Sequence, residues 1–117
     1  MPASPAPNER IADLVSILGE ADARELAQLF LASLNPLRLE LSSGDRVRAS
    51  RAAHSLKSSS QQMGLARMAG RMAQLEQRLL QIDGVVTDAD LDAVASELSD
   101  AEATLRPFAG PGQPAGS

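Results

Sequence analysis

The sequence predicts an all-α protein: an antiparallel four-helix bundle with a short additional N-terminal helix. Apolar residues recur at spacings of three and four, as in helices with one buried face, and no stretch alternates like a strand. Glycine, proline or a helix-capping residue separates successive segments. Four long amphipathic segments joined by short turns close most simply as an antiparallel bundle, and the short first segment would cover one end.

The first two helical segments have identifiable ends. Asn8 is a candidate N-cap for a short helix that ends at Gly19. The second helix begins at Asp22, where Glu25 three residues on would complete a capping box. Pro36 should kink this helix or remove one backbone hydrogen bond without breaking it. Apolar residues form one stripe along each segment: Ile11, Leu14, Val15 and Leu18 in the first, and Leu26, Leu29, Phe30, Leu34, Leu37 and Leu41 in the second, which runs to Gly44.

The remaining three segments are separated in the same way. Asp45 is a candidate N-cap for the third helix, and Gly64 interrupts the chain before the fourth. The fifth begins near Thr87 and has Pro107 as its stop. Their stripes are Ala49, Ala52, Leu56 and Met63; then Leu65, Met68, Met72, Leu75, Leu79 and Ile82; then Leu91, Val94, Leu98, Ala101 and Leu105. We interpret the methionines as core residues rather than as part of a cofactor site.

The two ends of the chain differ in composition from the middle. Three prolines among small residues precede residue 8, and the last eight residues are GPGQPAGS. Segments of this kind neither continue a helix nor bury apolar surface. We therefore expect flexible tails over residues 1–7 and 109–117, and one folded domain over residues 8–108.

Composition excludes several classes of protein. With no cysteine and one histidine, the chain has no disulfide and cannot build a zinc centre from these ligands, and we expect no metal site. A net charge of −4 and only two aromatic residues argue against a nucleic-acid-binding surface. The chain lacks a long apolar run and a signal peptide. We expect a cytoplasmic monomer without direct membrane contact.

The only histidine lies in the stretch AAHSLKSSS, residues 52–60. At about 100° per residue, His54 lies nearly opposite the apolar stripe of the third helix. It shares its side with Ser50, Arg51, Lys57, Ser58 and Gln61. The imidazole should therefore face solvent, where it is mostly neutral and nucleophilic at cytoplasmic pH.

Charges are segregated along the chain. From Arg46 to Leu75 there is no acidic residue but there are six basic ones: Arg46, Arg48, Arg51, Lys57, Arg67 and Arg71. From Asp83 to Glu102 there is no basic residue but there are seven acidic ones: Asp83, Asp88, Asp90, Asp92, Glu97, Asp100 and Glu102. We interpret the acidic fifth helix as a solvated face, and the basic residues around His54 as the mark of an acidic or phosphorylated partner.

The segment from His54 to Ser60, then Gly64 and then Leu75-Glu76, resembles the histidine phosphotransfer (HPt) domains of bacterial multistep phosphorelays. In that family H-x-L-K-G-S-S is followed by a glycine and a Leu-Glu or Leu-Gln. The resemblance extends over nearly the whole folded part. It departs at Ser58, which replaces the usual glycine and leaves somewhat less room beside the imidazole.

This resemblance implies a role for each motif residue. His54 would take a phosphoryl group from a receiver-domain aspartate, form a phosphoramidate and pass the group to another receiver. Lys57 would supply positive charge, and Glu76 would accept a hydrogen bond from the second ring nitrogen of His54. The expected contacts with the phosphoryl group or the receiver are Arg51, Ser58, Gln61, Gly64 and Val47, with Leu65 as a weaker docking candidate.

Nothing in the sequence resembles a nucleotide-binding loop, so the domain should need no cofactor and should not phosphorylate itself, with Mg²⁺ held by the receiver. Two alternatives remain open: an adaptor of the same fold that binds a receiver without relaying phosphate, and a purely structural bundle. The presence of His54 with Lys57 one turn away favours the relay. The proline- and glycine-rich ends favour a cytoplasmic domain of a membrane-anchored hybrid sensor kinase over a free-standing protein.

Overall fold

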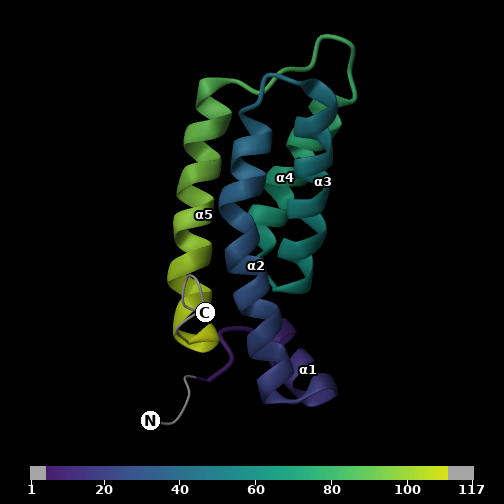
Figure 1. Ribbon diagram of the computed structural model, residues 1–117. Coiled ribbons are helices and arrows are strands. Elements are labelled where there is room, and N and C mark those ends of the chain that lie inside the picture. The colour runs from purple at the N-terminus through teal and green to yellow at the C-terminus, as the bar shows by residue number, and fades with distance from the viewer. Residues whose placement is uncertain (1–4, 111–117) are drawn as a thin grey trace.

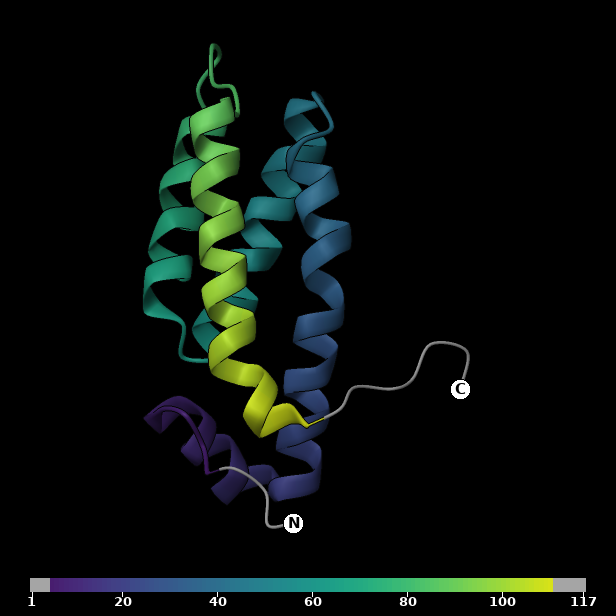
Figure 2. The same cartoon turned by 90° about the vertical axis from the view of Figure 1, so that its left-hand side faces the viewer.

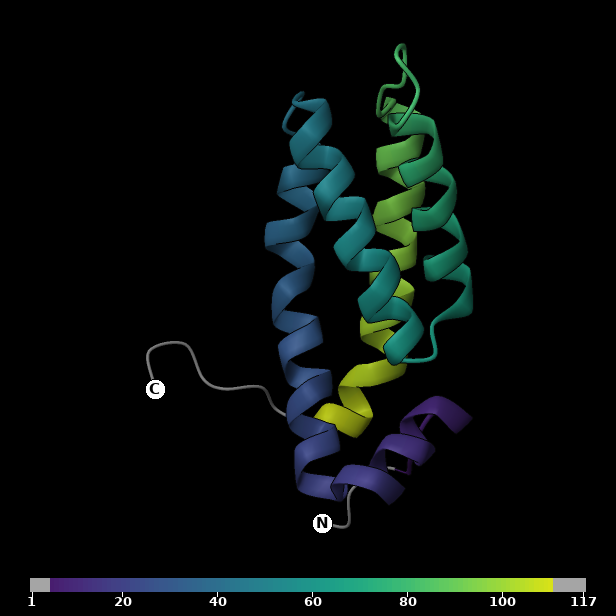
Figure 3. The ribbon, with the colours of Figure 1, turned by 90° about the vertical axis from the view of Figure 1, so that its right-hand side faces the viewer.

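The computed structural model describes residues 5–110, and every regular element in this range is an α-helix. The helices are α1 (Glu9–Leu18), α2 (Glu20–Leu41), α3 (Arg46–Gln62), α4 (Ala66–Leu79) and α5 (Asp88–Ala109). The four long helices run antiparallel in chain order, and α5 returns to pack against α2, so that the bundle closes (Figure 1). α1 lies at the lower end, beneath the turn between α3 and α4 (Figure 3). The predicted all-α fold is confirmed, while most of both predicted tails lies outside the described residues.

Three of the predicted helix starts are confirmed by their capping hydrogen bonds. The Asn8 side chain accepts a backbone N–H in the first turn of α1, and the Asp45 side chain accepts two at the start of α3. At the start of α5, Thr87 and Asp90 form a reciprocal capping box. Each cap satisfies N–H groups that have no partner within the helix itself.

α2 begins two residues earlier than predicted. Gly19 alone separates α1 from α2, and its φ of 90° lies in the region that favours glycine. Because this single residue redirects the chain, Asp22 and Glu25 lie inside α2, and the predicted capping box is wrong. Glu20 and Asp22 still place negative charge in the first turn, where unpaired N–H groups favour it.

Both prolines in the folded part lie inside helices. Pro36 lies inside α2 and does not break it, as predicted. Pro107 also lies inside a helix, because α5 continues to Ala109. The prediction that Pro107 stops the helix is therefore wrong. A helical proline leaves the carbonyl four residues earlier without its N–H partner. These carbonyls belong to Ala32 and Ala103, which are both exposed, so water can bond them.

The core lies between the four long helices, which Figure 2 shows from a second side of the bundle. Three methionines, Met63, Met68 and Met72, are buried in it, as predicted. Three residues of the predicted stripes are exposed rather than in the core. Leu18 is 42% exposed at the end of α1, Leu29 is 60% exposed on the outer side of α2, and Ile82 is 88% exposed because α4 ends at Leu79. No helix within residues 5–110 combines the length and apolar character needed to cross a membrane.

The acidic residues of α5 do more than face solvent. Glu97 accepts a hydrogen bond from Arg71 of α4 at 3.2 Å, and Asp90 pairs with Arg78, which is also in α4. The prediction of a purely solvated acidic face is therefore wrong for these two residues. The pairs link α4 to α5.

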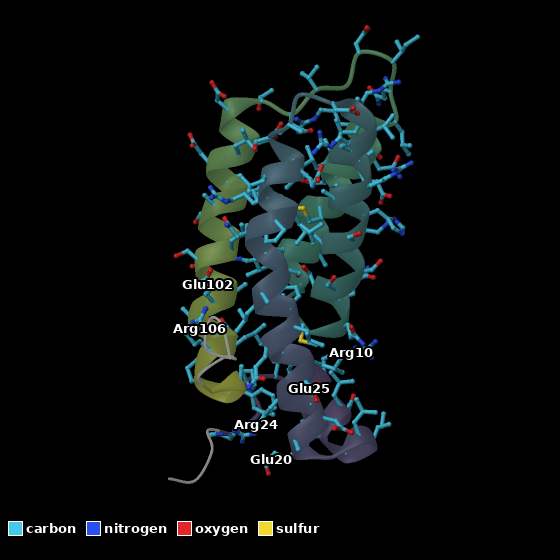
Figure 4. The ribbon with its side chains drawn as sticks, in the orientation of Figure 1. Arg10, Glu20, Arg24, Glu25, Glu102 and Arg106 are labelled. Atoms are coloured by element: carbon cyan, nitrogen blue, oxygen red, sulfur yellow. The ribbon has the colours of Figure 1, made fainter. Side chains whose placement is uncertain are left out.

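Further charged contacts lie at the lower end of the bundle, labelled in Figure 4. Arg24 pairs with Glu20 along α2, and its guanidinium lies 5.1 Å from the centre of the Phe108 ring. Glu102 and Arg106 form a pair of the same spacing on α5, at 3.6 Å. Because exposed pairs contribute little to stability, these contacts mainly order the surface.

Candidate functional site

His54 lies in the middle of α3, on the side away from the core. α3 buries Ala49, Ala52, Ala53 and Leu56 against the bundle. The imidazole projects from the opposite face, and its side chain is 62% exposed. The predicted orientation of His54 toward solvent is confirmed.

Glu76 of α4 contacts both His54 and Lys57 of α3. His54 Nδ1 lies 2.7 Å from Glu76 Oε2, and Lys57 Nζ donates a hydrogen bond to Glu76 Oε1 at 2.6 Å. The Glu76 side chain is only 16% exposed, because it lies between the two helices. One carboxylate therefore joins a histidine and a lysine that are one helical turn apart.

The charge on Glu76 decides which nitrogen of His54 is free. The Lys57 ammonium holds the pKa of Glu76 below its usual value of 4.5, partial burial acts against this, and the hydrogen bond with His54 lowers the pKa further. Glu76 is therefore ionised at neutral pH. A carboxylate can only accept a hydrogen bond, so in the neutral imidazole Nδ1 carries the ring proton and Nε2 keeps its lone pair. The arrangement leaves a nucleophilic nitrogen at the protein surface.

A Lys57→Met variant is expected to raise the pKa of Glu76 toward its ordinary value, because it removes the main group that lowers it. The lowered pKa stabilises the folded chain at neutral pH, and this contribution is lost as the pH falls below 4.5 toward the folded-state pKa. The variant should therefore lose less stability than the wild type between neutral and acidic pH. The measurements are an NMR titration of the Glu76 carboxyl carbon and urea unfolding at several pH values.

The matched control is Arg71→Met, which removes a cation that contacts Glu97 rather than Glu76. It should leave the Glu76 titration unchanged. An unchanged Glu76 titration in Lys57→Met itself would show that the contact between the two residues does not persist in solution.

Much of the positive charge predicted around His54 is engaged elsewhere. Arg48 donates two hydrogen bonds to Glu40 at 2.7 and 3.2 Å, Arg71 turns to α5, and Arg46 donates to a loop carbonyl at 2.6 Å. Arg51, one turn before His54, is exposed and makes no ion pair within residues 5–110. Of the basic residues on α3, Arg51 therefore carries the charge most available to an incoming anion.

Three other predicted contacts lie along α3 and at its end. Val47 is 58% exposed, two turns before His54 and about 10 Å away along the helix axis. Gln61 is exposed two turns after His54, at a similar distance. Leu65 is half-buried, packs against the core and precedes α4, so little of its side chain is available for docking.

Gly64 has a structural contact that the sequence did not reveal. It lies in the turn between α3 and α4 with a φ of 74°. A Cβ atom at this position would lie 2.6 Å from Cγ of Asn8. Asn8 Nδ2 donates a hydrogen bond to the Met63 carbonyl at 3.0 Å, while its Oδ1 caps α1. Asn8 thus fastens α1 to the end of α3, and no local pattern could indicate this because the residues are 55 positions apart.

The three serines after Lys57 occupy three different environments, because successive helical residues point about 100° apart. Ser58 is exposed on the side of His54. The Ser59 hydroxyl donates to the Ser55 carbonyl at 2.6 Å. Ser60 is fully buried, and its hydroxyl has no hydrogen-bond partner in the described part of the chain.

A Ser60→Ala variant is expected to be more stable than the wild type by about 1 kcal/mol, because a buried hydroxyl without a partner is costly and alanine is the better helix former. The measurement is urea unfolding. Ser59→Ala is the matched control, since its hydroxyl is bonded and only half-buried, and its effect should be smaller. A destabilised Ser60→Ala variant would show that the hydroxyl finds a partner in solution.

The helical fold agrees with the comparison to known families. The family model of the Hpt domain matches residues 9–104, and the chain therefore belongs to the Hpt domain family. Its members are helical phosphotransfer modules of two-component phosphorelays, and the resemblance inferred from the sequence is confirmed. No curated protein and no solved structure matches the chain.

Proposed function

We propose that this chain relays a phosphoryl group between receiver-domain aspartates through His54. The observation that carries the proposal is the exposed imidazole of His54, whose Nδ1 lies 2.7 Å from the carboxylate of Glu76, a side chain that is only 16% exposed. In the neutral imidazole such a contact leaves the lone pair of Nε2 free and accessible to a second protein. Membership of the Hpt domain family supports the same chemistry.

The transfer step follows from the charges of the three side chains. The Nε2 lone pair attacks the phosphorus of an aspartyl phosphate, and the bond from phosphorus to the aspartate oxygen breaks with its electrons passing to that carboxylate. The new N–P bond leaves the ring positively charged, with its proton on Nδ1. Glu76 accepts a hydrogen bond from this proton and stabilises the cation. Attack by a second aspartate on the phosphorus reverses the step.

Lys57 has two roles in this proposal. In the free domain it neutralises Glu76, with which it shares a hydrogen bond of 2.6 Å. Its ammonium is one turn from His54 and can move to the equatorial oxygens of the phosphoryl group as negative charge accumulates between the two proteins. Arg51 approaches the same region from the preceding turn, and within residues 5–110 no acidic residue pairs with it.

We infer that the remaining chemistry comes from the partner. The domain acts without a cofactor or kinase activity of its own, and the receiver supplies Mg²⁺ and the aspartate. The partners are receiver domains rather than nucleic acids or membranes, and the domain docks as a monomer. A cytoplasmic domain of a hybrid sensor kinase is the setting we propose.

The test is incubation of the purified chain with a panel of receiver domains that carry labelled phosphate. We expect no label from ATP and Mg²⁺ alone, and transfer from at least one receiver to give an adduct that is labile in acid and stable in alkali. Receivers that bind without transferring label would support the adaptor instead. An acid-stable adduct would place the phosphate on a hydroxyl and contradict the assignment to His54.

A further inference from the structure

We propose that the Ser58 hydroxyl donates a hydrogen bond to the phosphoryl group carried by His54, and thereby shifts the phosphoryl equilibrium toward this chain. The inference rests on the proposed relay function and concerns the same site. It assigns a positioning role to a residue at which the chain departs from the glycine usual in its family.

The first argument is the placement of Ser58 on α3. A residue four positions after another lies about 40° from it around the helix and one turn further along. Helical side chains lean toward the N-terminus, so the Ser58 side chain lies over the turn that carries His54. A phosphoryl group on Nε2 of the exposed ring therefore lies beside the hydroxyl.

The second argument is that the Ser58 hydroxyl is uncommitted. No hydrogen bond joins it to another group within residues 5–110, and the residue is exposed. Its neighbours on α3 are different: the Ser59 hydroxyl is bonded to the Ser55 carbonyl, and the Lys57 ammonium is bonded to Glu76. Ser58 can therefore donate to a phosphoryl oxygen without giving up a bond that the free domain already has.

The third argument is the orientation of the ring. The contact between Nδ1 and Glu76 turns that edge of the imidazole toward α4, so Nε2 and any group bonded to it lie on the opposite, solvent-facing edge. Hydrogen bonds from a hydroxyl to an anionic oxygen are short and strong. This bond exists only when the chain is phosphorylated, so it favours the phosphorylated form over the free form.

The test measures an equilibrium rather than a rate. A limiting amount of labelled phosphate is exchanged between the chain and one receiver until its distribution is constant. The ratio of phosphorylated to free chain, divided by the same ratio for the receiver, is the equilibrium constant. A change in docking alone would alter the forward and reverse transfer rates by the same factor. It would therefore leave the equilibrium constant unchanged.

We expect Ser58→Ala and Ser58→Gly each to lower this constant about three- to tenfold, as suits the loss of one charge-assisted hydrogen bond at an exposed site. Ser58→Thr, which keeps a hydroxyl, should retain a value near the wild type. Ser55→Ala is the matched control, because it removes an exposed hydroxyl on the same helix about 100° away from His54. Its constant should not change.

An unchanged constant in Ser58→Ala would overturn the inference while leaving the relay intact. A lowered constant in Ser58→Gly alone would also overturn it, because the effect would then follow the helix-weakening glycine rather than the missing hydroxyl. Failure of the proposed function is a distinct result, in which the wild-type chain accepts no phosphate at all. Circular dichroism of each variant verifies that the helices are retained.

Discussion

A His54→Ala variant is expected to accept no phosphoryl group from any receiver, while it stays folded and still binds the receiver. Transfer requires a nucleophile, and the neighbouring side chains of α3 supply none of comparable reactivity at neutral pH. The side chain of His54 is 62% exposed and lies opposite the core, so its removal leaves the packing of α3 in place. The measurements are single-turnover transfer of labelled phosphate, receiver binding by calorimetry, and urea unfolding.

Ser55→Ala is the matched control for this experiment, because it shortens an exposed side chain next to His54 on α3 that is not among the predicted contacts. It should keep most of the transfer activity. Label retained by His54→Ala would place the acceptor on another residue and remove the basis of the relay. Loss of both transfer and receiver binding would instead show that His54 is needed for docking.

A Gly64→Ala variant is expected to lose about 2–4 kcal/mol of unfolding free energy, the largest stability effect we predict. Two costs add. The positive φ of 74° costs a residue with a Cβ atom about 1–2 kcal/mol. The new Cβ would also meet the Asn8 side chain, with Cγ only 2.6 Å away, so Asn8 must move. Moving it weakens a helix cap and a hydrogen bond to the end of α3, each worth about 1 kcal/mol.

Urea unfolding of Gly70→Ala provides the matched control. Gly70 lies in the middle of α4, is exposed, and a Cβ there would meet no atom within 4 Å. This variant should gain about 0.5–1 kcal/mol, because glycine is unfavourable inside a helix. Similar effects of the two substitutions would show that the turn at Gly64 is relaxed in solution.

The double variant Asn8→Ala/Gly64→Ala separates the two costs. Once the Asn8 amide is absent, Gly64→Ala should cost only the backbone part, about 1–2 kcal/mol. The effects of the two single substitutions should therefore not add. Additive effects would show that Asn8 and Gly64 do not interact. Gly64 lies ten residues after His54, in the turn beyond the end of α3, so loss of phosphate transfer in folded Gly64→Ala would support the predicted receiver contact at Gly64.

Features that depend on neighbours along the chain could be predicted from the amino-acid sequence alone. Apolar spacing identified the helices and the buried side of each, and with it the exposure of His54, because a helix repeats every 3.6 residues whatever it packs against. Asn8 and Asp45 were identified as caps, and the start near Thr87 was placed, because a capping side chain bonds backbone groups two or three residues away. The motif around His54 indicated the family before any geometry was known.

Local patterns failed where a contact from elsewhere competed. Asp22 is a residue type that often caps helices. Gly19 turns the chain earlier, however, so Asp22 lies inside α2. Pro107 has the chemistry of a stop, yet α5 continues past it, since packing holds Phe108 and Ala109 in the core. Leu29 fits the apolar spacing of α2 but lies on a side that no other helix covers.

Which side chains meet at the site depends on how the helices pack against one another. Glu76 is 22 residues from His54, and its contact depends on the register and rotation of α4 against α3, which core packing sets. The same packing turns Arg71 toward Glu97 and places Asn8 against Gly64. Helical periodicity specifies the direction of a side chain relative to its own helix axis, but not the distance between two axes or their relative shift, and the chemistry of His54 depends on both.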